Sequence, residues 1–323
     1  MQYKLRRESF ASLIIALAGL FAFVTIVIAD TATTSVTVGN ATPSLSVTFN
    51  GGNAITLTES TFAYASATLT ITDGNGCNTI NFVTATAFLA STSALAGTPC
   101  AENDNNCYPT SSTTASGIPA ALSDTLCLAT TTGNQCTGGG DTSVQYDCGF
   151  KLWFIAEATA AGSPTWASSI WAVAATTSDG TATTTASNTT QNVEINSLAA
   201  TAVDATLSFG TLSANTNTGA TNSTTTATTT GNIAIDVALS GTNMTGAGTI
   251  DVSRQKYSTS PFTYSSAGTH LTNTTTPTVE LASGEPTATT SLPASAISWG
   301  IAIDAGQANG AYTGTDTFTA QAD

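Results

Sequence analysis

The densest group of metal-binding side chains lies in the short stretch between Cys100 and Cys107. Glu102, Asp104 and Asn106 alternate along it, and each offers a side-chain oxygen. Calcium takes six to eight oxygen ligands, so three oxygens in a constrained loop could converge on one ion. The EF-hand spacing is absent, and a plain hydrophilic loop tip explains the same residues. The sequence leaves open a calcium site at these three residues or a solvated loop, and it indicates no other cofactor.

All six cysteines fall between positions 77 and 148. In an exported chain they predict three disulfide bonds, because thiols oxidise outside the cytoplasm. Zinc is the competing use of cysteine, but no CxxC pair occurs. Spacing alone does not choose a connectivity. Closure of short local loops favours the following pairs: Cys100 with Cys107, Cys127 with Cys136 and, as the remainder, Cys77 with Cys148.

Residues for nucleophilic catalysis are scarce. His270 is the single histidine, and it stands in a polar stretch with neither a GxSxG sequence nor a cysteine partner. We interpret it as an exposed structural residue. Carboxylate pairs for glycoside cleavage depend on the fold, but the acidic residues are spread singly through expected turns. The sequence assigns no catalytic residue, and we expect the protein not to be an enzyme.

The four tryptophans could form a platform for sugars or fill a core. Trp153, Trp171 and Trp299 stand in apolar strand patterns, which favours burial of their indoles. Trp166 follows a Gly-Ser-Pro-Thr stretch and is expected in a loop.

Charge and composition exclude several classes of protein. The chain of 323 residues is 41% hydrophobic and 8% charged, with 20 acidic and 6 basic residues and a net charge of −14. Its surface must therefore be built from neutral polar residues, above all threonine, which favours strands. No basic stripe is present to neutralise phosphates, so we exclude nucleic acid as a partner.

The N-terminus is typical of an exported protein. Lys4, Arg6 and Arg7 precede an uncharged stretch, residues 9–29, that ends in Val-Ile-Ala. Residues 1–29 are therefore predicted to be a signal peptide. The stretch is long enough to span a bilayer, so an uncleaved anchor helix is the alternative, and residues 9–29 would then be the membrane contact. Under both interpretations the rest of the chain is extracellular or displayed at the cell surface.

Runs with a period of two, bounded by turn residues, predict an all-β fold. We expect a disulfide-containing domain over residues 30–178, a linker over residues 179–190 or an exposed edge strand running into it, and a cysteine-free domain over residues 191–323. Gly231-Asn232 is expected to be a two-residue hairpin turn. The expected strands are 44–49, 54–58, 67–72, 80–89, 143–157, 166–177, 202–212, 224–230, 233–239, 249–253, 262–264, 278–281, 296–303 and 311–320.

Three segments carry a resemblance to known proteins. Residues 171–180 and 202–243 are similar to Ig-like modules of prokaryotic surface proteins. Residues 299–320 resemble the closing hairpin of a Thr-rich exported protein type of ultra-small bacteria and some archaea. The resemblance implies two tandem Ig-like β-sandwiches and a surface location, and it brings no catalytic motif.

Together these features predict a non-enzymatic structural protein of the prokaryotic cell envelope, displayed or assembled at the cell surface. The alternatives are an adhesin that binds glycans or host cells, and a fibre subunit joined by donor strands. The expected partners are further copies of the chain, other cell-surface proteins or glycans.

Overall fold

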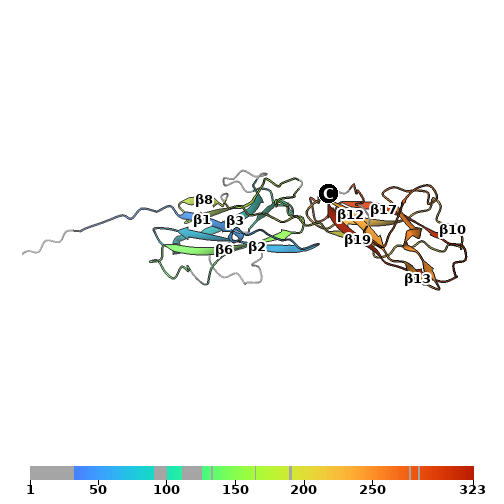
Figure 1. Cartoon of the computed structure of the whole chain (residues 1–323). Helices are drawn as coiled ribbons and strands as arrows, with labels where there is room; N and C mark the ends of the chain where they lie inside the picture. The colour runs from blue at the N-terminus through green and yellow to red at the C-terminus, as the bar shows by residue number, and fades with distance from the viewer. Residues whose placement is uncertain are drawn as a thin grey trace, which may run out of the picture. The chain divides into compact units, whose positions relative to one another are not determined.

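The structure is a computed structural model of the whole chain, and it describes residues 33–90, 100–110, 126–131, 134–163, 165–188, 191–275, 278–282 and 284–323. The expected signal or anchor segment, residues 1–29, lies outside the described residues. The chain divides into residues 1–39 and a compact unit of residues 40–323 (Figure 1). Within the described ranges, no helix has the length and apolar character needed to cross a membrane.

The described residues form strands and single-turn 3₁₀ helices, which confirms the all-β prediction. We call residues 40–199 the N-terminal region and residues 200–323 the C-terminal region. The strands of the N-terminal region are β1 (Ser44–Phe49), β2 (Phe62–Thr72), β3 (Phe82–Leu89), β4 (Cys107–Pro109), β5 (Cys127–Ala129), β6 (Ser143–Trp153), β7 (Trp171–Ser178) and β8 (Thr183–Ser187). The 3₁₀ helices there are η1 (Asn50–Gly52) and η2 (Cys77–Thr79).

Two antiparallel sheets of four strands enclose the core of the N-terminal region. Their strand orders are β1-β2-β6-β5 and β4-β3-β7-β8. Phe49, Leu69 and Phe150 come from the first sheet, and Val83 and Trp171 come from the second. Side chains of β6 alternate between buried and more exposed positions, as its sequence predicted.

The stretch expected to be a linker or an exposed edge strand, residues 179–190, contains an edge strand. Strand β8 lies within it and pairs with β7 along its whole length. Beyond β8, Val193 and Ile195 are fully buried in the N-terminal core. A strand at the edge of a sheet has one neighbour and needs few large apolar side chains, so a Thr-rich edge strand resembles a linker in sequence.

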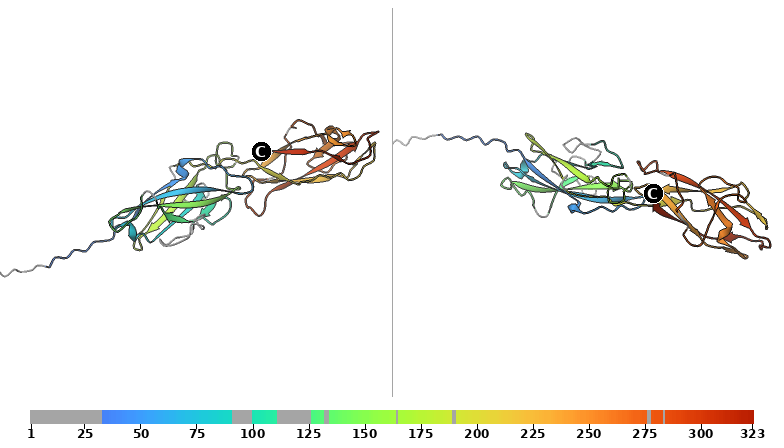
Figure 2. Two further views of the ribbon diagram at one scale, coloured as in Figure 1. Left: turned by 90° about the horizontal axis from the view of Figure 1, so that it is seen from below. Right: turned by 45° about the horizontal axis from the view of Figure 1, so that its top comes forward.

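The C-terminal region is also all-β. Its strands are β9 (Thr201–Val203), β10 (Thr216–Asn217), β11 (Ser223–Thr229), β12 (Ile235–Gly241), β13 (Met244–Gly246), β14 (Thr249–Ile250), β15 (Gln255–Ser258), β16 (Thr269–His270), β17 (Ala294–Ile303), β18 (Tyr312–Thr313) and β19 (Asp316–Ala322). A 3₁₀ helix, η4 (Val252–Arg254), precedes β15. One sheet has the order β16-β15-β17-β11-β9, with β10 also paired to β17, and β12 pairs with β19. The ribbon of this region runs from yellow to red in Figure 2. Trp299, Leu239 and Tyr257 are buried in this second core.

The predicted hairpin at Gly231-Asn232 is wrong. Strands β11 and β12 belong to different sheets, and neither turn residue has a positive φ. Such a φ at both residues is what a two-residue type I′ hairpin requires. Gly231 instead passes against the backbone of Leu198, where an added Cβ would lie 1.8 Å from the carbonyl oxygen. A glycine that looks like a hairpin signal is therefore needed for a close backbone approach.

Some segments that were expected to be strands are irregular in the structure. Some of their backbone amides donate to side-chain oxygens instead of to the backbone of a neighbouring strand. Asn222 Oδ1 accepts from the amide of Phe262 at 2.8 Å. Asp236 Oδ1 accepts from the amide of Leu281 at 2.7 Å. Residues 262–264 contain no strand, and residues 278–281 contain a single bridge at Val279. The period-two pattern does not distinguish this side-chain pairing from a strand ladder.

Candidate functional site

All six cysteines are paired in the structure, which supports the prediction of three disulfide bonds. Three disulfide bonds indicate an oxidising, extracellular environment. The Cys100–Cys107 bond agrees with the expected pair. The other two expected pairs, Cys77–Cys148 and Cys127–Cys136, are wrong. The observed bonds are Cys77–Cys136, Cys100–Cys107 and Cys127–Cys148.

Strand register decides this connectivity. Cys127 on β5 lies directly opposite Cys148 on β6, with their Cα atoms 3.9 Å apart. The amide of Cys77 donates to the carbonyl of Asp141 at 2.7 Å, which holds η2 beside the loop that carries Cys136. Short separation in sequence predicted only the Cys100–Cys107 bond, because the strand pairing of Cys107 is with Phe88 and brings no other cysteine opposite it.

Polar side chains of the loop between Cys100 and Cys107 are hydrogen-bonded to other protein groups. Glu102 is exposed, whereas Asp104 Oδ2 accepts from Thr289 Oγ1 at 2.5 Å. Asn106 Oδ1 accepts from Asn103 Nδ2 at 3.0 Å. Two of the three expected calcium ligands, Asp104 and Asn106, are thus already engaged with protein donors.

Asn105, which the sequence did not single out, is the buried residue of this loop. Its side-chain Nδ2 donates to the carbonyl oxygens of Ile155 at 2.9 Å and Pro286 at 3.3 Å. Its backbone carbonyl accepts from the amide of Glu157 at 3.0 Å. The cysteine-bounded loop therefore connects the end of β6 to residues 285–289 of the C-terminal region.

A pair of carboxyl groups, Glu157 and Glu285, lies at this junction. Glu157 follows β6 in a buried turn and is 6% exposed. Burial, and next the negative charge of Glu285, raise the pKa of Glu157 to about 8. Glu285 Oε2 accepts from Thr165 Oγ1 at 3.0 Å. Sequence reading did not find the pair, because its members are far apart in the chain.

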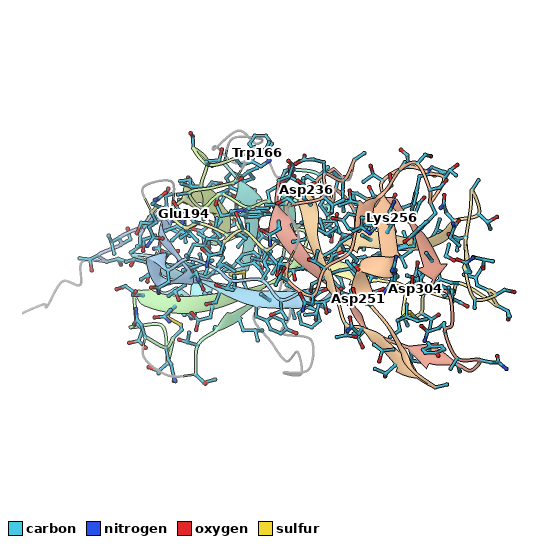
Figure 3. The ribbon with its side chains drawn as sticks, turned by 45° about the vertical axis from the view of Figure 1, so that its right-hand side comes forward. Trp166, Glu194, Asp236, Asp251, Lys256 and Asp304 are labelled. Carbon is cyan, nitrogen blue, oxygen red and sulfur yellow. A yellow bond between two sulfur atoms is a disulfide. The ribbon has the colours of Figure 1, made fainter. Side chains whose placement is uncertain are left out.

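Three buried polar atoms at the pair have no hydrogen-bond partner. They are Glu157 Oε2, Glu285 Oε1 and the indole Nε1 of Trp166. Trp166, labelled in Figure 3, lies near enough to Glu157 to oppose the rise in its pKa, although it does not reach hydrogen-bond geometry. Most buried polar groups in folded proteins are hydrogen-bonded. Three unpaired atoms in one place are therefore unusual.

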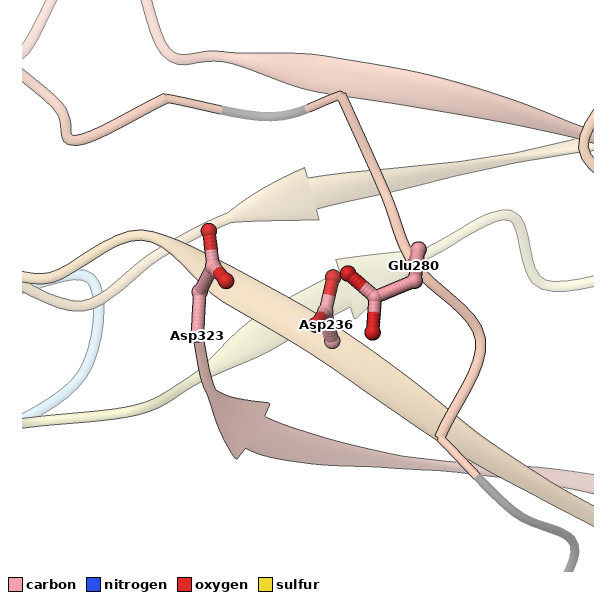
Figure 4. Close-up of side chains that lie close together, drawn as sticks. All are labelled: Asp236, Glu280 and Asp323. Atoms are coloured by element: carbon pink, nitrogen blue, oxygen red, sulfur yellow. The ribbon is translucent and has the colours of Figure 1, made fainter.

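A second group of acidic residues lies in the C-terminal region (Figure 4). Carboxylate oxygens of Asp236, Glu280 and Asp323 lie within 4.8 Å of one another. This spacing suits a cation, but Asp236 already accepts from the Leu281 amide, and the other two residues are exposed. Solvent exposure explains these two carboxylates without a bound ion.

Aromatic residues gather on the outer face of β2 and β6. Phe62 lies opposite Trp153 and Tyr64 lies opposite Lys151. Lys151 Nζ lies 4.0 Å from the centre of the Phe62 ring, and Tyr64 is 56% exposed. An adjoining cavity of about 110 Å³ is lined by Lys151, Trp153 and residues of the cysteine-bounded loop. Small-molecule sites are usually about 300–1,000 Å³, so this cavity would hold only part of a ligand.

The remaining residues singled out by sequence have structural positions. Trp171 and Trp299 are fully buried, as expected, whereas Trp153 is half-buried. His270 is exposed, and its Nδ1 contacts the carbonyl oxygen of Ser253 at 2.6 Å. These positions agree with the expected structural roles of Trp171, Trp299 and His270.

A scan against protein-family models found no match, and a search of curated proteins found no similar sequence. The resemblance to Ig-like surface modules therefore stays a prediction.

Proposed function

We propose that the protein is a non-enzymatic structural protein of the prokaryotic cell envelope, built from two tandem Ig-like β-sandwiches and displayed or assembled at the cell surface. The observation that carries this proposal is the buried side chain of Asn232, which joins the N-terminal and C-terminal regions. A protein exposed outside the cell under mechanical or proteolytic stress benefits from a junction that does not open.

Asn232 is 0% exposed and uses its whole amide group. Its Oδ1 accepts from the amide of Leu198 at 2.7 Å. Its Nδ2 donates to the carbonyl oxygens of Ala156 at 2.9 Å and Asn196 at 3.2 Å. These are the bonds available to an asparagine amide, apart from a second lone pair. A buried, satisfied side chain of this kind favours one arrangement of the chain at the junction.

The uncharged surface of the edge strand β8 supports a role in an assembly of several copies of the chain. Residues of β8 alternate between exposed and half-buried positions, and Thr176 and Thr185 share a hydroxyl hydrogen bond of 3.0 Å across β7 and β8. Threonine surfaces carry no charge, so copies of the chain can approach closely without repulsion at these faces.

Imaging of intact native cells with a labelled antibody tests the proposal. We expect dense labelling over the outer surface, and we expect the purified protein to self-associate as its concentration rises in sedimentation experiments. Label confined to the growth medium, together with a protein that stays monomeric, would contradict an envelope role.

The aromatic group on β2 and β6 favours the second candidate function, an adhesin. Pyranose rings stack on exposed aromatic faces, and Tyr64 provides such a face beside Lys151 and the half-buried Trp153. Saturable binding of the monomer to a glycan array, lost in the variant Tyr64→Ala, would favour this function over a purely structural one.

Residues 33–39 favour the donor-strand alternative. They belong to no assigned strand, and Val36 and Val38 are 88% and 79% exposed. An exposed β-branched segment can complete the sheet of another copy. Fibres that disappear when Val36 and Val38 are both replaced by Asp would support this assembly.

A further inference from the structure

The pair formed by the buried Glu157 and the half-buried Glu285 has no counter-charge among the described residues. Glu157 is more than nine-tenths buried, its Oε2 has no hydrogen-bond partner, and the carboxyl group of Glu285 lies against it. Two like charges in a buried place repel one another and lose their hydration, and both effects disfavour folding. Either a proton shared between the two carboxyl groups or a bound cation would neutralise the pair, and the raised pKa of Glu157 shows that it holds a proton readily when no cation is bound.

The described part of the chain offers no lysine or arginine to do so. Lys151 lies over the aromatic rings of β2 and β6. Arg254 is paired with Asp304 at 2.7 Å. Lys256 donates to two backbone carbonyl oxygens in the C-terminal region. These are the three basic residues in the described ranges, and each is engaged away from the pair.

The other groups that face the pair are acidic or neutral. Asp104 and the phenol of Tyr108 lie near it from the cysteine-bounded loop and β4. The phenol donates to the backbone carbonyl of Asp104. Asn105 and Trp166 present N–H groups, which can orient a carboxylate but cannot neutralise two. The positive charge that neutralises the pair therefore comes from the solvent, either as a proton or as a cation.

We propose that Glu157 and Glu285 bind one divalent cation of the calcium class, which ties residues 285–289 to the N-terminal region. Carboxylate oxygens are ligands for hard cations such as Ca²⁺ and Mg²⁺. Softer metals would seek thiolate or imidazole, and here every cysteine is in a disulfide and the histidine lies on β16. Calcium suits the site better than magnesium because its coordination geometry is flexible, whereas magnesium demands a near-ideal octahedron.

Hydrogen bonds from neighbouring residues hold the two segments that carry the glutamates in position before the ion binds. Thr165 holds Glu285 through its Oε2 and leaves Oε1 unpaired. Asn105 holds the carbonyl of Pro286, and Thr289 holds Asp104. A cation would add a charged link between segments that already hydrogen-bond.

Terbium(III), a luminescent substitute for calcium, tests the site in the full chain. The indole of Trp166 lies beside the pair and should sensitise terbium emission. We expect saturable emission that calcium displaces. Glu157→Gln and Glu285→Gln should each weaken binding by at least about tenfold, since each removes one of two charged ligands. Trp166→Phe should lose the emission but keep the calcium-dependent rise in Tm.

A double variant of the C-terminal acidic group, Glu280→Gln with Asp323→Asn, is the matched control and should behave like the wild type. Circular dichroism of each variant checks that it folds. Emission lost in this control but kept in the two Glu→Gln variants would overturn the proposal and place the ion at Asp236. No saturable emission and no calcium effect on Tm would also overturn it, and would show that the pair shares a proton instead.

Discussion

The two regions of the chain differ in their covalent cross-links, although side chains accept hydrogen bonds from backbone amides in both. The N-terminal region carries all three disulfide bonds, whereas the C-terminal region has no cysteine. In the C-terminal region, side chains of Asn222, Asp236 and Asn243 accept from backbone amides of distant loops at 2.7–2.9 Å. A covalent bond restricts the unfolded chain, while these hydrogen bonds act only in the folded state. The regions should therefore respond differently to reductant.

The largest expected effect is the loss of the Cys127–Cys148 bond. Replacing both cysteines with alanine should destabilise the N-terminal region by about 2–5 kcal/mol, the usual range for a native disulfide. Calorimetry should show the unfolding transition of the N-terminal region at a lower temperature and that of the C-terminal region at an unchanged temperature. A wild-type C-terminal transition that also falls in reductant would contradict the separation of the two cores.

The next largest effect is expected at Gly231, where the regions meet. In Gly231→Ala, the new Cβ would collide with the Leu198 carbonyl oxygen, which is backbone and cannot rotate away. We expect a loss of about 1–3 kcal/mol, typical of overpacking, measured by urea unfolding. Gly140→Ala is the control, because its Cβ meets nothing within 4 Å. Equal effects of the two variants would mean that the close approach is not needed.

Removal of the Asn232 amide should cost about 1–3 kcal/mol, because Asn232→Ala leaves a buried amide and buried carbonyl groups unpaired. The junction should loosen, so proteolysis between residues 196 and 200 should become faster while each core stays folded. Asn192→Ala, at an exposed site, should have no such effect. An unchanged cleavage rate in Asn232→Ala would show that this side chain does not hold the junction.

The smallest effect concerns pH and the C-terminal region alone. Burial raises the pKa of Asp316, and a bond of 3.2 Å from Gln255 Nε2 only partly opposes this. The folded state therefore holds this proton more tightly than the unfolded state. Its stabilising contribution is complete below the unfolded pKa of about 4 and disappears as pH rises through the folded value.

In Asp316→Asn, that part of the pH dependence should vanish. The C-terminal transition of the variant should change less between acid and neutral pH than that of the wild type, while the N-terminal transition should be the same in both proteins. Identical pH profiles of the C-terminal transition would show that Asp316 titrates normally.

Local chemistry along the sequence determined the class of the fold. Alternation along β6 predicted its buried face, apolar neighbours predicted the burial of Trp171 and Trp299, and the cysteine count predicted three disulfides. Each of these inferences depends on residues close together in the chain, where the period of a strand is directly visible.

Tertiary structure alone decided which segments meet. The register of β5 on β6 chose the partner of Cys148, the free edge of β7 made β8 a strand, and Gly231 was needed for contact with Leu198. The Glu157–Glu285 pair arises in the same way. Neither glutamate has a local signal, because burial and the approach of a second carboxyl group exist only after distant segments pack together.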